Sequence, residues 1–223
     1  MTKKLGPNPS HRVAASDDLE VSAYLEIAQQ KSAQEPLSQL APGSEREAIL
    51  VIDFGSQYSR LIARRVRETK TYCEIIPHDA TWESVAHLDC KGVILSGGPS
   101  SVYEPGAPMA PAWVYDRHLP VLGICYGMQV MVHQLGGKVV PGAKREYGHA
   151  TLHQNASDLP LFHGLPASMP VWMSHGDQIV RLPDEFIPLA TTSTCPFAAV
   201  RHRDKPFVGV QFHPEVTHTP HGS

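Results

Sequence analysis

Two short apolar runs constrain the fold more than any other feature of this sequence. Residues 49–52 (ILVI) and 93–95 (VIL) are apolar at consecutive positions, not at alternate ones. Strands with this pattern are covered on both faces, as in a parallel sheet flanked by helices. Each run is followed by small residues and then by helical periodicity, which is the βα alternation of an α/β fold. The sequence therefore predicts a mostly parallel sheet with helices on its faces.

The alternation extends over the first half of the chain, and the second half reads as mainly β. Strands are expected at residues 48–53, 71–76, 92–96 and 121–125, with helices beginning near Ser56, Thr81, Pro111 and Tyr126. After about Gly136 the strand-like segments are 138–140, 150–153, 171–174, 198–203 and 207–212. Asp204 and Lys205 lie between the last two segments, where a hairpin turn is expected.

The N-terminal part of the chain differs in composition from the rest. Residues 1–47 contain four prolines, a mixture of Gln, Ser and Ala, and one amphipathic stretch at 19–27. An isolated helix this short barely forms in water, so a mobile extension is expected, with a docking helix as the alternative. Residues 48–223 are expected to form one domain, because a chain of this length has room for little more than one core.

Charge and composition argue against several classes of function. Nineteen Lys and Arg stand against 22 Asp and Glu, without a basic run, so nucleic-acid binding is not expected. No apolar run approaches the roughly 20 residues that span a bilayer, and no signal peptide is evident, so membrane association is not expected either. The four cysteines lie far apart without a CxxC pair, which fits free thiols in the cytoplasm.

Cys125 is the candidate nucleophile. The sequence GICYG at 123–127 follows an apolar strand and precedes a helical segment, so Cys125 is expected at a sharp strand-to-helix turn. Glycines two residues before and two after it suit a strained turn that leaves no room for side chains. The helix N-terminus favours the thiolate over the thiol. The other three cysteines are interpreted as buried structural residues.

His213 is the candidate base. Residues 209–215 (GVQFHPE) end a strand with His213, followed by a proline and then Glu215. A cysteine nucleophile needs a base, and the base works best when a third group fixes its tautomer. Glu215 is the candidate for that group.

The SGGPS turn at residues 96–100 is the candidate oxyanion site. A Gly-Gly turn after a strand lets backbone N–H groups approach a ligand closely. The N–H groups of Gly98 and Tyr126 are the expected donors. A phosphate cradle is less well supported, because the turn lacks the Lys-Ser/Thr of a P-loop, and a purely structural turn stays open.

These three motifs in this order resemble the class I, or triad-type, glutamine amidotransferases. DFGSQY at 53–58, REYG at 145–148, WMSHGD at 172–177 and VTHT at 216–219 are similar, within that family, to the amidotransferase domains of GMP synthases. The resemblance covers about residues 48–221. It implies a flavodoxin-like, mostly parallel sheet flanked by helices, with a β-rich second half.

The resemblance also implies a reaction. Cys125 would attack the side-chain amide of glutamine, His213 would protonate the leaving ammonia and then activate water, and Glu215 would orient His213. The residues implied at the glutamine site or the synthetase interface are Gln129, Ser174, His175, Gly176 and Asp177. A purely structural role for these five is an equally open interpretation, and no metal ligand is expected in this chain.

The family pattern places the acceptor chemistry elsewhere. A GMP synthetase, or ATP-pyrophosphatase, domain or subunit would use the ammonia to aminate XMP, with ATP and Mg²⁺ bound only there. No SGGVDS-type nucleotide motif occurs here, and the C-terminal end of the domain is expected to be truncated. The alternatives are an amidotransferase for carbamoyl phosphate, CTP or anthranilate synthesis, or a non-catalytic regulatory partner of a synthetase.

Overall fold

The structure is a computed structural model that describes residues 46–155 and 160–222. Residues 45–223 group into one compact unit, and this unit is described by itself. The expected extension at residues 1–47, with its amphipathic stretch, lies almost entirely outside the described residues.

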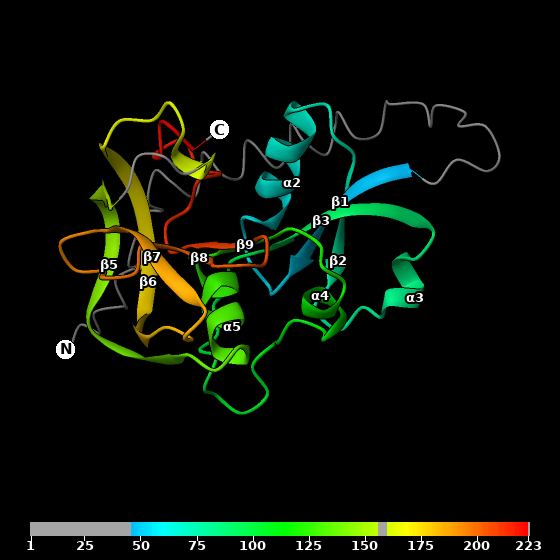
Figure 1. Cartoon of the computed structure of the whole chain (residues 1–223), viewed down its shortest axis with the longest axis horizontal. Helices are drawn as coiled ribbons and strands as arrows, with labels where there is room; N and C mark the ends of the chain where they lie inside the picture. The colour runs from blue at the N-terminus through cyan, green and yellow to red at the C-terminus, as the bar shows by residue number, and fades with distance from the viewer. Residues whose placement is uncertain (1–45, 156–159, 223) are drawn as a thin grey trace, which may run out of the picture. The chain divides into compact units, whose positions relative to one another are not determined.

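The described residues form a nine-stranded mixed sheet in the order β2-β1-β3-β4-β9-β8-β7-β5-β6 (Figure 1). Its first four strands are parallel, as the apolar runs predict. They are β1 (Arg46–Asp53), β2 (Cys73–Pro77), β3 (Leu88–Leu95) and β4 (Val121–Ile124).

Helices follow these strands near the predicted starting points. They are α2 (Ser59–Glu68), α3 (Trp82–Val85), α4 (Trp113–Asp116) and α5 (Tyr126–Gln134). Figure 1 shows α2 on one side of the parallel strands and α4 and α5 on the other.

Strand β1 explains why consecutive apolar residues are needed. Leu50 and Ile52 pack in the cluster that includes Met128 of α5, whereas Val51 packs in the cluster that includes Ile62 of α2. Both faces of the strand are therefore covered, and all three strand residues are fully buried. Burying each such side chain contributes about 1.5–3 kcal/mol.

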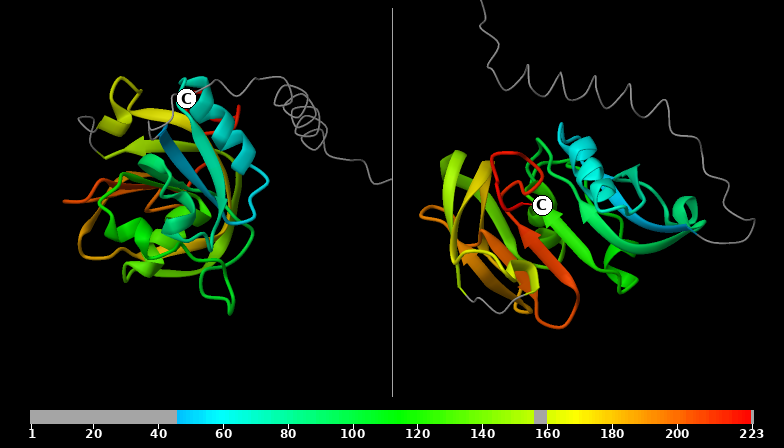
Figure 2. Two further views of the ribbon diagram at one scale, coloured as in Figure 1. Left: turned by 90° about the vertical axis from the view of Figure 1, so that its right-hand side faces the viewer. Right: turned by 90° about the horizontal axis from the view of Figure 1, so that it is seen from above.

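The second half supplies the remaining strands. They are β5 (Lys138–Gln154), β6 (Ser168–Arg181), β7 (Phe186–Thr191), β8 (Ala199–His202) and β9 (Phe207–Val210), with a short 3₁₀ helix at Pro160–Phe162. Strands β5 and β6 form a long antiparallel ribbon (Figure 2). The antiparallel hairpin predicted around residues 204 and 205 joins β8 to β9.

The second half differs from the expectation in two respects. The segments predicted at 138–140 and 150–153 belong to one 17-residue strand, β5, whose pairing with β6 is irregular between Pro141 and Glu146. Strand β7 was not predicted. It contains Pro188, and a proline within a short apolar run argues against a strand from sequence alone.

Strand β9 joins the two halves of the sheet. It pairs in parallel with β4 on one side and antiparallel with β8 on the other. Parallel neighbours end at the same edge of a sheet, so the residues after Ile124 and after Val210 emerge side by side. The Cys125 N–H donates to the Val210 carbonyl at 2.8 Å and extends this pairing by one step.

Candidate active site

Cys125 occupies the tight turn between β4 and α5. Its φ of 51° and ψ of −107° lie in a region that side-chain-bearing residues rarely adopt, at a cost of about 1–3 kcal/mol. A Cβ on Gly127 would lie 2.2 Å from the Leu95 carbonyl oxygen, and one on Gly123 would lie 2.8 Å from the Met128 Cα. The two glycines are therefore required by the close packing of the turn, as the sequence predicts.

His213 and Glu215 follow β9 and are both buried. The His213 Nδ1 lies 2.8 Å from the Glu215 Oε1. The backbone at this corner is also fixed, because the His213 N–H donates to the Trp172 carbonyl at 2.9 Å and the Thr219 hydroxyl donates to the His213 carbonyl at 2.7 Å. The Arg65 Nε donates to the Glu215 carbonyl at 3.1 Å. The orientation of the imidazole is thus determined from several sides.

The charge state of His213 depends on its two neighbours. Burial alone lowers the pKa of His213, but the sulfur of Cys125 and the carboxylate of Glu215 outweigh burial and raise the pKa well above its ordinary value. The Tyr58 ring also packs edge-to-face with the imidazole, with ring centroids 5.3 Å apart. The imidazolium is therefore the favoured form beside the sulfur, which suits an ion pair with a thiolate.

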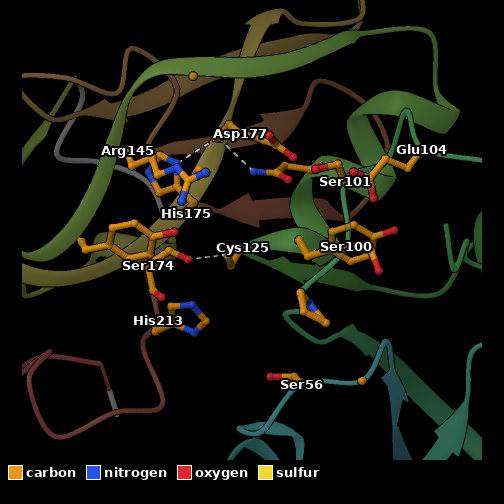
Figure 3. A pocket seen from close by; sticks show the side chains of 18 of the residues that line it. Ser56, Ser100, Ser101, Glu104, Cys125, Arg145, Ser174, His175, Asp177 and His213 are labelled. Atoms are coloured by element: carbon orange, nitrogen blue, oxygen red, sulfur yellow. Dashed lines mark hydrogen bonds between the residues drawn. The ribbon is translucent and has the colours of Figure 1, made fainter. Parts of the chain in front are cut away.

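Cys125 and His213 line one open cavity of about 740 Å³ (Figure 3). The Cys125 Sγ lies 3.6 Å from the Ser174 carbonyl oxygen. A Cβ on Gly97 would lie 3.3 Å from the His213 Cε1 and 3.9 Å from the Cys125 Cβ, so a side chain at this position would press against both residues. Sequence analysis did not assign a role to Gly97.

The two predicted oxyanion donors also lie on this cavity. Gly98 and Tyr126 both line it. The Tyr126 N–H is the first of helix α5 and has no acceptor within its own helix. A Cβ on Gly98 would lie 3.0 Å from both the Phe54 carbonyl oxygen and the Tyr126 Cδ1. Only glycine fits this place without a shift of its neighbours.

One wall of the cavity comes from α5 and β6. The Gln129 Nε2 donates to the Asp177 carbonyl at 3.3 Å and to the Gln211 Oε1 at 3.2 Å. The exposed Tyr103 hydroxyl donates to the Asp177 Oδ1 at 2.8 Å. All five residues that the family resemblance implied here line the cavity: Gln129, Ser174, His175, Gly176 and Asp177.

Several further residues of the cavity were not predicted as site residues. Arg145 and Glu104 bring charges of opposite sign to the same opening as Asp177 (Figure 3). Arg145 lies within the REYG motif and Ser56 within the DFGSQY motif, so the signal was present in the sequence without an assigned role. The Asp53 Oδ1 organises the DFGSQY segment by accepting the Gly55 N–H at 2.9 Å.

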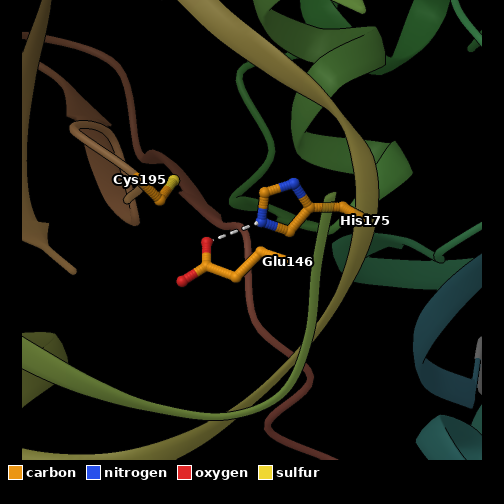
Figure 4. Close-up of side chains that lie close together, drawn as sticks. All are labelled: Glu146, His175 and Cys195. Carbon is orange, nitrogen blue, oxygen red and sulfur yellow. Dashed lines mark hydrogen bonds and ion pairs between the residues drawn. The ribbon is translucent and has the colours of Figure 1, made fainter. Parts of the chain in front are cut away.

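Glu146, His175 and Cys195 form a second cluster (Figure 4), and its His175 also lines the cavity. Its candidate ligand atoms lie within 4.8 Å of one another. Imidazole, thiolate and carboxylate together are a set that Zn²⁺ prefers. Each oxygen of Glu146 already contacts a protein group, His175 or Thr192, and burial raises the pKa of Cys195 to about 12. The arrangement is therefore complete as a hydrogen-bonded cluster without an ion.

Within the described residues, no helix is long and apolar enough to cross a membrane.

Comparison with known proteins relates this geometry to one family. The class-I glutamine amidotransferase family matches residues 50–223. The GMP synthase (glutamine-hydrolysing) of Dehalococcoides mccartyi strain 195 is 54% identical over 199 residues, which are 89% of this chain and 37% of that protein. The Thermomicrobium roseum enzyme of the same name is 55% identical over 79% of this chain and 33% of its own length. The chain thus spans about a third of the length of these relatives.

Solved structures agree with the fold. A putative GMP synthase subunit from Thermoplasma acidophilum superposes with a TM-score of 0.72 at 33% identity, covering 80% of this chain and 89% of that chain. A glutamine amidotransferase from Thermotoga maritima superposes with a TM-score of 0.60 at 22% identity, which bears on the fold alone. The predicted fold class, a class I amidotransferase-like (flavodoxin-like) fold with helices on the sheet and a β-rich second half, is confirmed. The sheet was expected to be mostly parallel and is mixed, because the strands of the second half pair antiparallel.

Proposed function

The chain belongs to the class-I glutamine amidotransferase family, and from this premise we propose that it hydrolyses glutamine to glutamate and ammonia. The observation that carries the proposal is that Cys125, on its strained turn, and the buried His213–Glu215 pair meet at one cavity. Nucleophile, base and orienting acid are the three groups that acyl transfer from an amide requires.

In the proposed reaction the Cys125 thiolate attacks the side-chain carbonyl carbon of glutamine. The carbonyl oxygen becomes an oxyanion, which the N–H groups of Gly98 and Tyr126 stabilise, at about 3 kcal/mol for each donor. The C–N bond then breaks, and ammonia leaves with the proton that His213 donates. A thioester between Cys125 and the glutamyl group remains.

The second half of the reaction regenerates the thiol. His213 removes a proton from a water molecule, which attacks the thioester carbonyl, and the C–S bond breaks to release glutamate. Glu215 holds the Nδ1 side of the imidazole, so the Nε2 side is left to exchange protons with sulfur, ammonia and water. These steps need no redox group or metal ion from this chain.

The charges at the cavity mouth suit the main-chain groups of a free amino acid. Arg145 offers a cation to a carboxylate, and Glu104 and Asp177 offer anions to an ammonium group. Gln129 and the residues 174–177 complete the proposed glutamine wall.

We further propose that the ammonia serves a GMP synthetase, an ATP-pyrophosphatase domain or separate subunit that aminates XMP with ATP and Mg²⁺. The support is the name of the relatives that are 54–55% identical to this chain and of the Thermoplasma structure. A cytoplasmic location is proposed with it, because all four cysteines are free thiols.

Ammonia release from glutamine tests the proposal. The wild-type chain and Cys125→Ala are compared, each alone and with a GMP synthetase domain charged with ATP, Mg²⁺ and XMP. We expect Cys125-dependent release that is low for the chain alone and raised by the charged synthetase. Equal release by Cys125→Ala, or none from any mixture of folded protein, contradicts the glutaminase. Release that XMP and the synthetase leave unchanged contradicts the proposed acceptor.

A further inference from the structure

His175 has oxygen atoms at both of its ring nitrogens. Its Nδ1 lies 2.9 Å from the Asp177 carbonyl oxygen, and its Nε2 lies 3.2 Å from the Glu146 Oε2. A carbonyl oxygen only accepts, so the Nδ1 carries a proton. The Nε2 side of the ring is left to face the Glu146 carboxylate. The imidazole is therefore clamped between a backbone group and an acid.

Glu146 is fixed from the opposite side. The Thr192 hydroxyl donates to the Glu146 Oε1 at 3.0 Å and accepts the Cys195 N–H at 3.0 Å. Glu146 and His175 are also partners across the β5–β6 ribbon, at the point where regular pairing resumes after the irregular stretch. Their side chains are 13% and 7% exposed. A buried carboxylate with both oxygens bonded has little freedom to move.

The clamped imidazole holds the glutamine wall. The Asp177 carbonyl that accepts from His175 also accepts from Gln129, one helical turn after Cys125. The residue before His175 is Ser174, whose carbonyl oxygen faces the Cys125 sulfur. A shift of His175 would move both carbonyl groups. Glu146 itself does not line the cavity, so any effect of Glu146 on the site passes through His175.

We propose that Glu146 is a positioning residue for glutamine binding, acting through His175 on the wall formed by residues 174–177. This inference rests on the proposed glutaminase activity and deepens it. The sulfur, imidazole and acid of the reacting centre follow β4 and β9, and neither His175 nor Glu146 makes a hydrogen bond to any of these three side chains among the contacts of the described residues. Loss of Glu146 should therefore raise the KM for glutamine and leave the reactivity of Cys125 in place.

Two variants test the inference. Glu146→Gln keeps the shape of the side chain but removes its charge, and His175→Asn keeps an amide donor for the Asp177 carbonyl but cannot reach Glu146. We expect Glu146→Gln to raise the KM for glutamine about tenfold, which is the lower end of the effect of losing a hydrogen bond to a charged group. The kcat should stay within about threefold of the wild-type value. In the His175→Asn background, Glu146→Gln should change the KM less than about twofold, because the route through His175 is already cut.

Matched measurements separate positioning from general damage. Glu47→Gln, which removes an exposed carboxylate paired with Lys91, is the control and should keep the wild-type KM. Alkylation of Cys125 by iodoacetamide should proceed at the wild-type rate in Glu146→Gln. If Glu146→Gln does not fold, Thr192→Val removes the hydroxyl from the Glu146 Oε1, and we expect it to raise the KM about threefold, as for a net hydrogen bond.

Failure of the role proposed for Glu146 can be told apart from failure of the proposed glutaminase activity. Calorimetric binding of glutamine is measured on the Cys125→Ala background, where no turnover occurs, and should weaken about tenfold with Glu146→Gln. Unchanged binding and KM, with Cys125-dependent ammonia release intact, overturns the role of Glu146. An equal loss in the wild-type and His175→Asn backgrounds overturns the route through His175. Ammonia release that does not depend on Cys125 overturns the proposed function instead.

Discussion

The carboxylate of Glu215 lies 2.8 Å from the Nδ1 of His213, two residues earlier in the chain. The proline between the two residues limits the backbone of this corner, so acid and imidazole face each other with little conformational freedom. The remaining oxygen of Glu215 is buried and has no hydrogen-bond partner among the described residues. The acid therefore acts on His213 alone.

Replacing Cys125 by alanine is expected to reduce glutamine hydrolysis at least about 10³-fold, because no other described group of the cavity is a thiol. Steady-state ammonia release checks this. Cys90→Ala is the matched control, since Cys90 is a buried thiol on β3, outside the cavity, and should keep nearly full activity. Comparable losses in both variants would contradict a special role for Cys125.

Glu215→Gln is expected to lower kcat by roughly 10²–10⁴-fold while the KM for glutamine stays within about threefold. An amide can face the Nδ1 of His213 but does not stabilise the imidazolium. Steady-state kinetics on the folded variant provides the measurement. A rise in KM at constant kcat would place Glu215 in substrate binding instead.

The raised pKa of His213 predicts a pH dependence. Burial lowers this pKa, and the charges of Cys125 and Glu215 raise it by more. A group whose folded pKa exceeds its unfolded value stabilises the fold below the unfolded value, about 6.5, and this contribution is lost as pH rises through the folded pKa. Cys125→Ala should lower the pKa and flatten the dependence of unfolding free energy on pH above about 7.

NMR titration of the His213 ring, together with urea denaturation at several pH values, measures both effects. Cys90→Ala, whose thiol is buried outside the cavity, is the control and should leave the titration of His213 as in the wild type. A His213 that titrates identically in wild type and Cys125→Ala would show that the sulfur does not carry the charge inferred here.

Gly127→Ala is expected to destabilise the domain by roughly 3 kcal/mol, the upper end for overpacking, because the new methyl group would meet the Leu95 backbone at 2.2 Å. Gly176→Ala is the control. Its methyl group would have no neighbour closer than 3.8 Å, at the Arg145 side chain. Thermal unfolding of both variants checks the difference, and equal unfolding temperatures would contradict the tight packing of the turn.

The sequence was most informative where a residue's surroundings depend on residues a few positions away in the chain. The runs around Leu50 and Val93, and the glycines beside Cys125, predict their own surroundings, because burial on two faces and a tight turn leave a pattern within a few positions. The structure confirms these elements. The roles of Cys125, His213 and Glu215 stay predictions until the variants above are measured.

The sequence was least informative where the pairing of β5 with β6 determines which residues are neighbours. Glu146 lies opposite His175 because the pairing resumes there after an irregular stretch. The alternation of apolar and polar residues does not predict the register after such an irregularity. Arg145 reaches the cavity for the same reason. Tyr103 lies in a loop whose path no periodicity fixes, and its contact with Asp177 was therefore not predictable.

The junction between β4 and β9 has a mechanical consequence. Four residue pairs, from Val121 with Phe207 to Ile124 with Val210, tie the two strands before one delivers the thiol and the other the imidazole. The spacing between the thiol and the imidazole is therefore set by the backbone hydrogen bonds that join β4 to β9. Residues 174–177 of the glutamine wall belong instead to β6, the strand at the end of the sheet. The reacting pair and these wall residues are therefore carried by different strands.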